Sequence, residues 1–76
     1  MKSGAVMDIF RLEGHPHIEL CDLLKIEGWA ESGAMAKAMI AEGLVQVDGV
    51  IETRKRCKIA AGKVVSMGDQ KIKVQD

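Results

Sequence analysis

The stretch that decides the fold is SGAMAKAMIAEGLVQVDGVIETRKRCK, residues 32–58. It begins with a helix, because the hydroxyl of Ser32 can accept a hydrogen bond from a free amide of the first turn and so act as an N-cap. Apolar residues then recur at helical spacing on one side. Gly43 can adopt the left-handed backbone conformation that commonly ends a helix. These signals predict a helix over residues 33–42.

A hairpin and a dense basic segment follow this helix. Residues 44–47 and 50–53 are predicted to be antiparallel strands, because Asp48-Gly49 between them is typical of a type I′ turn. The chain then runs into four cations within five residues. Such cations repel one another and resist burial, so we expect an exposed loop or strand end. The cations are Arg54, Lys55, Arg56 and Lys58.

Outside this stretch, the local patterns predict one more helix and three more strands. Apolar residues at three-and-four spacing indicate a helix over residues 20–27, ended by Gly28. Alternation indicates strands over residues 64–67 and 71–75, and a short strand over residues 8–12. We therefore expect a single α+β domain, residues 1–76, in which two helices pack on a small, mainly antiparallel sheet. Residues 1–16 form an N-terminal extension that carries the short strand.

The charge of the 76-residue chain is balanced overall but segregated along the sequence. Residues 1–52 carry four cations and nine anions, whereas residues 53–73 carry seven cations and one anion. A neutral protein with a basic third can still present a local positive field to a polyanion. With no leader segment and no apolar run of membrane-spanning length, we expect a cytoplasmic protein without a membrane partner.

The sequence offers little for catalysis or metal binding. No base lies beside a nucleophile at usable spacing, and no glycine loop could cradle a phosphate, so we expect no enzymatic activity and no cofactor. His15, His17 and Cys21 are zinc-type ligands, but their spacing matches no closed site and a fourth ligand is missing. Trp29 could stack on a base, although in a chain this poor in aromatic residues it is better explained as a core anchor.

The basic segment carries the strongest chemical signal. Arginine presents a planar fork that matches phosphate oxygens in pairs, and lysine adds a mobile point charge, so the mixture suits an irregular phosphate backbone. The alternative is a solvated patch that serves solubility. Ser32 and Lys37 extend the phosphate hypothesis to the second helix, whose N-terminal amides could hold an anion. An ordinary cap is the favoured explanation of Ser32, and it does not exclude anion binding.

Several short motifs, in order, resemble a known family. These motifs are Leu23-Leu24-Lys25, Gly28-Trp29-Ala30, Ser32-Gly33-Ala34-Met35-Ala36-Lys37, Glu42-Gly43, Val45-Gln46-Val47-Asp48-Gly49, Glu52-Thr53-Arg54 and Gly62-Lys63-Val64-Val65. Together they resemble the RNA-binding domain named after small-subunit ribosomal protein four, and most of all its short free-standing bacterial members. The resemblance covers about residues 17–75.

The resemblance implies an αL fold that binds structured RNA with its helix pair and the adjacent loop. The RNA-binding residues that it implies are Lys37, Arg54, Lys55, Arg56 and Lys58, together with Lys25 and Ser32. Many larger members have an arginine where the first helix begins and another just after the second helix cap, whereas this chain has Glu19 and Gly33. We therefore expect the loop cations to dominate binding.

The sequence thus predicts a non-catalytic protein that binds structured RNA, ribosomal or transfer RNA in particular. We expect a monomer that contacts RNA, with the ribosome or its assembly intermediates as further partners. The alternative is a small adaptor, in which the acidic first half and the basic loop dock a protein partner.

Overall fold

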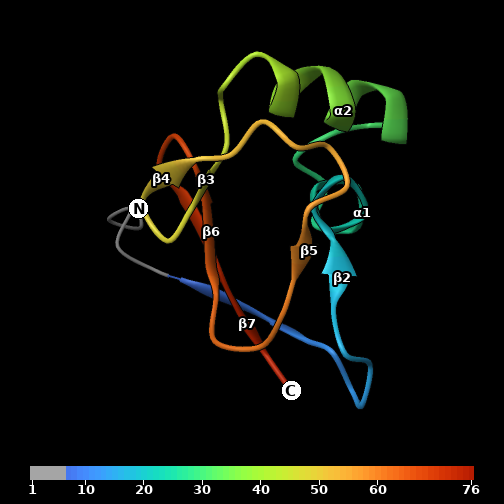
Figure 1. The fold of residues 1–76 in the computed structure, drawn as a ribbon, viewed down its shortest axis with the longest axis vertical. Coiled ribbons are helices and arrows are strands. Elements are labelled where there is room, and N and C mark those ends of the chain that lie inside the picture. The colour runs from blue at the N-terminus through green and yellow to red at the C-terminus, as the bar shows by residue number, and fades with distance from the viewer. Residues whose placement is uncertain (1–6) are drawn as a thin grey trace.

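A computed structural model describes residues 7–76 of the chain (Figure 1). Within this range it has two helices and seven short strands, so the predicted α+β class is confirmed. In chain order the elements are β1 (Asp8–Arg11), β2 (Ile18–Glu19), α1 (Leu20–Ile26), α2 (Gly33–Ala41), β3 (Gln46–Val47), β4 (Val50–Ile51), β5 (Lys58–Ile59), β6 (Val64–Met67) and β7 (Gln70–Gln75).

The strands form two sheets. The larger has the order β1-β7-β6-β3-β4, with β1 parallel to β7 and every other pair antiparallel. The smaller is the antiparallel pair β2-β5, in which Glu19 lies opposite Lys58. The predicted strand over residues 8–12 is present as β1, and its parallel pairing with β7 makes it an edge of the main sheet. The weakly patterned residues 1–6 lie outside the described range.

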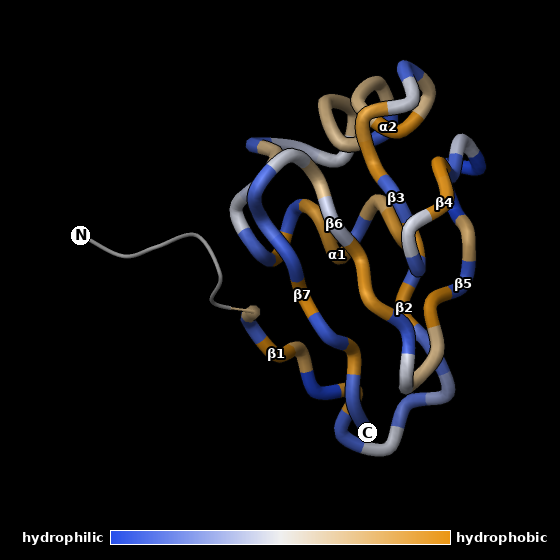
Figure 2. Tube along the Cα trace, turned by 90° about the vertical axis from the view of Figure 1, so that its left-hand side faces the viewer, coloured by the Kyte–Doolittle hydropathy of each residue, from blue (hydrophilic) through white to orange (hydrophobic). Residues whose placement is uncertain are grey.

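The core lies between the helices and one face of the larger sheet. Leucines of α1 and the inward residues of α2 meet alternate residues of the strands, since side chains of a strand point to opposite faces in turn. Figure 2 views the larger sheet from the side away from α1, and neither of the two helices in residues 7–76 covers that face. The buried core cluster contains Leu12, Leu20, Cys21, Leu23, Leu24, Ala30, Ala36, Ile40, Val45, Ile59, Val65 and Val74.

Most of the local predictions are confirmed. The helices end one residue earlier than predicted, because Glu27 and Glu42 are their C-caps. The Asp48-Gly49 turn has φ of 53° and 83°, and two successive positive φ angles are what a type I′ turn requires. The two-stranded sheet was not predicted, because strands of two residues carry no periodic signal of their own.

Candidate functional site

The four clustered cations lie on one loop, which begins after β4 and enters β5. We call residues 54–58 the basic loop. Figure 1 shows the chain between β4 and β5 passing beneath α2 on its way to the β2-β5 pair. All four cationic residues are exposed, while Cys57 is half-buried and packs against the core. The predicted exposure of this segment is therefore confirmed.

Backbone hydrogen bonds hold the basic loop against the start of α1. The amide of Leu20 donates to the carbonyl oxygen of Cys57 at 2.9 Å, and the amide of Cys21 donates to that of Lys55 at 3.1 Å. Glu19 is the N-cap residue of α1, and its side chain caps no amide. Carbonyls of the loop thus satisfy helix amides that would otherwise lack partners. The loop is fixed in place by the helix that it caps.

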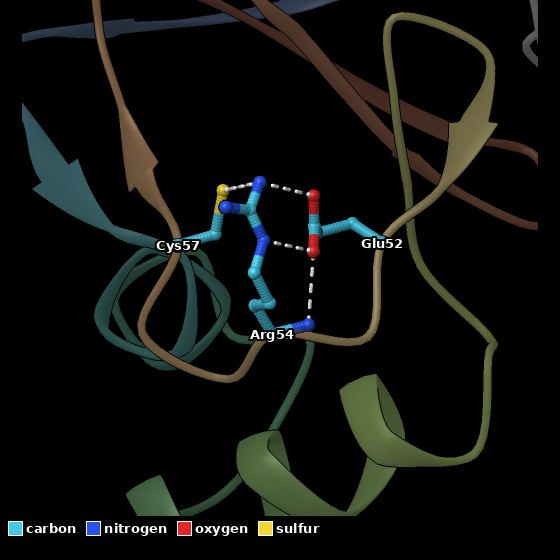
Figure 3. A network of polar contacts seen from close by, with 3 residues as sticks. All are labelled: Glu52, Arg54 and Cys57. Atoms are coloured by element: carbon cyan, nitrogen blue, oxygen red, sulfur yellow. Dashed lines mark hydrogen bonds and ion pairs between the residues drawn. The ribbon is translucent and has the colours of Figure 1, made fainter.

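A carboxylate holds the first arginine of the loop. The Glu52 carboxylate accepts from the backbone amide and from Nε of Arg54, both at 2.9 Å, and from its Nη2 at 3.0 Å (Figure 3). The same Nη2 donates to Sγ of Cys57 at 3.5 Å. These side-chain and backbone hydrogen bonds from Arg54 lower the pKa of Glu52 from 4.5 to about 2. The Glu52–Arg54 pair therefore remains ionised at any physiological pH.

A second carboxylate reaches the loop from β2. Nε of Arg56 donates to Oε1 of Glu19 at 3.2 Å, and this hydrogen bond raises the pKa of Arg56. Glu19 also lies opposite Lys58 in the β2-β5 pair, so one carboxylate faces two cations. Among residues 7–76, neither Lys55 nor Lys58 takes part in an ion pair within 4.0 Å. Within the described range, the two arginines of the loop are thus directly bonded to carboxylates and the two lysines are not.

The loop surrounds an open depression of about 430 Å³. Its lining consists of Arg54, Arg56, Cys57 and Lys58, with no carboxylate among them. Three cationic residues line one depression, and the carboxylates that pair with its two arginines are not part of the lining, which favours an oxyanion ligand. Arginine forks and a lysine point charge together can bind oxygens that differ in direction. The arrangement can bind phosphate groups.

The structure does not bring every predicted residue to this depression. Lys55 is exposed on the same loop but does not line it. Lys25 is exposed in the last turn of α1, and Lys37 is exposed on α2. The hydroxyl of Ser32 accepts from the amide of Met35 at 3.1 Å, which is the cap that the sequence predicted. The exposed side of α2 around Lys37 carries mainly small residues, namely Ala34, Ala38 and Ala41, and Met35 of the same helix is also exposed.

Sequence reasoning did not identify the two carboxylates that organise the loop. A signal existed for Glu52, because residues two apart in an extended segment project to the same side, and Arg54 is two residues further on. No local signal could have paired Glu19 with Arg56, which are 37 residues apart. The role of Cys57 as an acceptor beside Arg54 was also not predicted.

Among residues 7–76, neither the cysteines nor the metal-type ligands form a second site. Cys21 and Cys57 are free thiols, and burial raises the pKa of Cys57, which disfavours the reactive thiolate. The described part of the chain has no group of three or more His, Cys, Asp or Glu side chains placed to hold a metal ion. Neither α1 nor α2 has the length and apolar character needed to cross a bilayer.

Three comparisons with known proteins agree with one another. A family model described as the S4 domain matches residues 10–75. Over 68 residues the chain is 63% identical to a protein of Escherichia coli (strain K12) named "Putative RNA-binding protein YbcJ", which covers 90% of this chain and 97% of that protein. A Shigella flexneri protein named "Uncharacterized protein YbcJ" matches with the same identity and coverage.

A solved structure matches as well. It is a solution structure of YbcJ from E. coli, described as revealing an αL motif involved in RNA binding. The TM-score is 0.73 at 56% sequence identity, and the match covers 100% of this chain and 96% of the other. The expected fold, two helices on a mainly antiparallel sheet as in the αL motif, is therefore confirmed.

Proposed function

The chain belongs to the S4 domain family, and from this premise we propose that it is a non-catalytic protein that binds structured RNA through its basic loop. The loop would contact phosphates, with α2 beside it. We further propose that the RNA is ribosomal or transfer RNA. The protein would bind it in the cytoplasm as a monomer, and the ribosome or its assembly intermediates would be further partners. The names of the relatives and the αL motif of the solved neighbour support RNA as the ligand.

The observation that carries the proposal is the depression lined by Arg54, Arg56 and Lys58. Its arginines are held in position before any ligand arrives, by Glu52 and by Glu19. Preorganised donors lose less conformational entropy when they bind, so more of the interaction energy becomes affinity. The remaining guanidinium N–H groups and the free ammonium of Lys58 are available to phosphate oxygens.

Recognition would depend on phosphate geometry more than on bases. The deep major groove of A-form RNA hides the base edges, so side chains contact phosphates and 2′-hydroxyls. A stacking platform for single-stranded bases needs exposed rings. Trp29 and Phe10, the two aromatic residues of the chain, are both half-buried against the core. The small side chains on α2 would let a backbone approach closely, with Lys37 adding one charge.

The proposal is tested by binding of the wild type and of an Arg54→Ala/Lys55→Ala/Arg56→Ala variant to structured ribosomal RNA fragments over a salt series. Each neutralised phosphate contributes a slope of about −0.7 to −0.9 to log K against log salt, so the wild type should bind with a steep slope and the variant with a shallow one. If both proteins bound the RNA equally well and without dependence on salt, the proposed function would be wrong.

The rival is a protein adaptor, which the segregated charges of the chain favour. Residues 1–52 carry an excess of anions and the basic loop carries cations, so oppositely charged patches could dock a partner. Affinity capture from a cell extract with and without nuclease separates the two functions. Partners that disappear after nuclease treatment support RNA binding, whereas partners that persist support the adaptor.

A further inference from the structure

The face of the larger sheet that turns away from the helices carries a second group of cations. Figure 2 looks directly at this face, which we call the open face, with α1 behind the sheet. The inward residues Ile72 and Val74 of β7 are fully buried. Lys71 and Lys73 alternate with them and therefore point outwards from the open face. They are two residues apart on one strand, about 6.8 Å along it.

The strand register places further cations beside this pair. Val64 lies opposite Lys73, and the preceding residue, Lys63, has a half-exposed side chain. At the other edge, Ile9 lies beside Lys73, and Arg11 comes two residues later on the same face of β1. The basic residues at or beside the open face are Arg11, Lys63, Lys71 and Lys73.

The acidic residues near the edges of this face, within residues 7–76, are Asp48, Asp69 and Asp76, and Asp48 pairs with a lysine. Asp48 accepts from the amide of Val64 at 2.9 Å, and Nζ of Lys63 lies 3.3 Å from its other oxygen. The hydrogen bond from Val64 lowers the pKa of Asp48, and the charges of Lys63 and Lys73 add to the effect, so these groups are close together. Asp69 lies beyond the strand ends, in the β6–β7 turn.

Asp8, the acidic residue of β1, lies on the opposite side of the sheet from these lysines. Asp8 lies in register with the buried Ile72, on the face that the helices cover. There burial raises the pKa of Glu27 in the C-cap of α1, and the charge of Asp8 raises it further. Asp8 thus lies on the helix side of β1, and among residues 7–76 the strand positions on the open face include the cations Arg11, Lys71 and Lys73 but no acid.

We propose that the open face is a second RNA-binding surface, in which Lys71 and Lys73, supported by Lys63 and Arg11, bind the phosphate backbone of a further segment of the RNA held by the basic loop. This inference rests on the proposed function, because it assumes that the loop binds RNA. A protein partner is less suited to this face, since stable protein interfaces are centred on buried aromatic or aliphatic anchors. Among residues 7–76, the open face instead centres on Lys71 and Lys73, with no aromatic side chain and with Ile9, Val64 and Ile51 as apolar neighbours spread over three strands.

The two surfaces face different directions, so they would engage different segments of one folded RNA. Figures 1 and 2 place the basic loop near α2 and β5, and the open face on the far side of β6 and β7. Binding at two linked positions raises the overall affinity without any new contact at the first position. A short RNA hairpin that contacts only the basic loop of the protein would gain no affinity from the open face.

The test uses a Lys71→Gln/Lys73→Gln variant, with Lys71→Arg/Lys73→Arg as the charge-preserving control. Lys63 is left intact because its ion pair with Asp48 stabilises the β3–β4 turn. The probes are a short RNA hairpin and long ribosomal RNA fragments. With the long fragments, the Gln variant should lose affinity by roughly tenfold and its salt slope should shrink by about 1.4 to 1.8, the value for two lost phosphate contacts. The Arg variant should bind both probes as the wild type does.

The outcomes separate this proposal from the function on which it rests. If the wild type binds neither RNA probe, the proposed function fails. If a Lys55→Gln/Lys58→Gln loop variant is weakened but the Lys71→Gln/Lys73→Gln variant binds long RNA like the wild type, only the second surface fails. Displacement of long RNA from the open face by an equal charge of polyglutamate would also overturn it, because the face would then bind acidic chains in general.

Discussion

The basic loop and the exposed side of α2 are neighbours that present very different surfaces. The loop holds four cations in five residues, anchored by two backbone hydrogen bonds to α1 and by carboxylates behind two of its arginines. The exposed side of α2 is formed mainly by small residues around Lys37, and it is positioned by the Ser32 cap. One region supplies concentrated, fixed charge and the other supplies a smooth surface.

This difference shows that a dense cluster of cations needs nearby carboxylates and backbone hydrogen bonds to keep it in place. Four adjacent cations repel one another, and the loop tolerates them because Glu52 and Glu19 neutralise part of the charge. Both ion pairs are exposed on the arginine side, so they contribute little to stability and mainly fix orientation. The comparison predicts that changes in the loop will alter RNA binding strongly and that changes in α2 will alter it weakly.

The largest expected effect comes from removing the loop charges while keeping its shape. A Lys55→Gln/Arg56→Gln/Lys58→Gln variant leaves the Glu52–Arg54 pair intact. Three lost phosphate contacts should reduce the salt slope by about 2 to 3 and weaken binding by roughly a hundredfold at moderate salt. Filter binding over a salt series measures both, and Lys37→Gln is the matched helical control. If the triple variant lost no more RNA affinity than Lys37→Gln, the loop would not be the stronger of the two binding regions.

Removing the carboxylate behind Arg56 should strengthen binding. Glu19→Gln keeps a side-chain oxygen that can accept from Arg56 but takes a negative charge away from the phosphate site, so RNA affinity should rise by about two- to fivefold, the equivalent of one exposed ion pair. Glu31→Gln is the control, since it makes the same charge change in the exposed segment between the helices. Weaker binding by Glu19→Gln would mean that the negative charge of Glu19, and not its hydrogen bond alone, is needed to position Arg56.

The Ser32 cap should matter for the helix more than for the ligand. Ser32→Ala removes the acceptor for the Met35 amide and should cost about 1 kcal/mol of unfolding free energy. In a domain of this size that corresponds to a fall in Tm of about 4 to 8 °C, measured by circular dichroism. RNA affinity at low temperature should change by less than about twofold, below the effect of one lost phosphate contact. A loss as large as that of the loop triple variant would show that α2 is a main contact.

The smallest expected change near neutral pH is in the stability that the Glu52–Arg54 pair contributes, because this pair titrates only in acid. The folded-state pKa of Glu52, about 2, lies below the usual 4.5, so its contribution to stability is complete above pH 4.5 and is lost as the pH falls towards 2. The NMR chemical shift of Arg54 Nε–H should therefore stay constant down to about pH 4 and change as the pH approaches 2. In Glu52→Gln this pH dependence should disappear. A transition near pH 4.5 in the wild type would contradict the depressed pKa.

Local signals predicted α2, the hairpin and the position of the cations. A cap, a helical apolar pattern and an Asp-Gly pair each act over a few residues, so the sequence alone contains them. The density of cations likewise requires no tertiary information.

The organisation of the site depends on contacts between distant parts of the chain. The β2-β5 pair forms only when residues 18–19 meet residues 58–59, and with it come the loop carbonyls that cap α1. The ion pair of Glu19 with Arg56 and the clustering of Lys63 near Lys73 have the same origin. The sequence indicated Glu19 as a departure from larger family members, but its pairing required the fold.

The most direct test of the central claim compares two charge-matched variants in one RNA-binding experiment. Lys55→Gln/Lys58→Gln removes two charges from the basic loop, and Lys25→Gln/Lys37→Gln removes two from the helices. The account predicts that the loop pair reduces the salt slope by about 1.4 to 1.8 and that the helix pair reduces it by less than about 0.7. A helix pair that loses as much slope and affinity as the loop pair would contradict it.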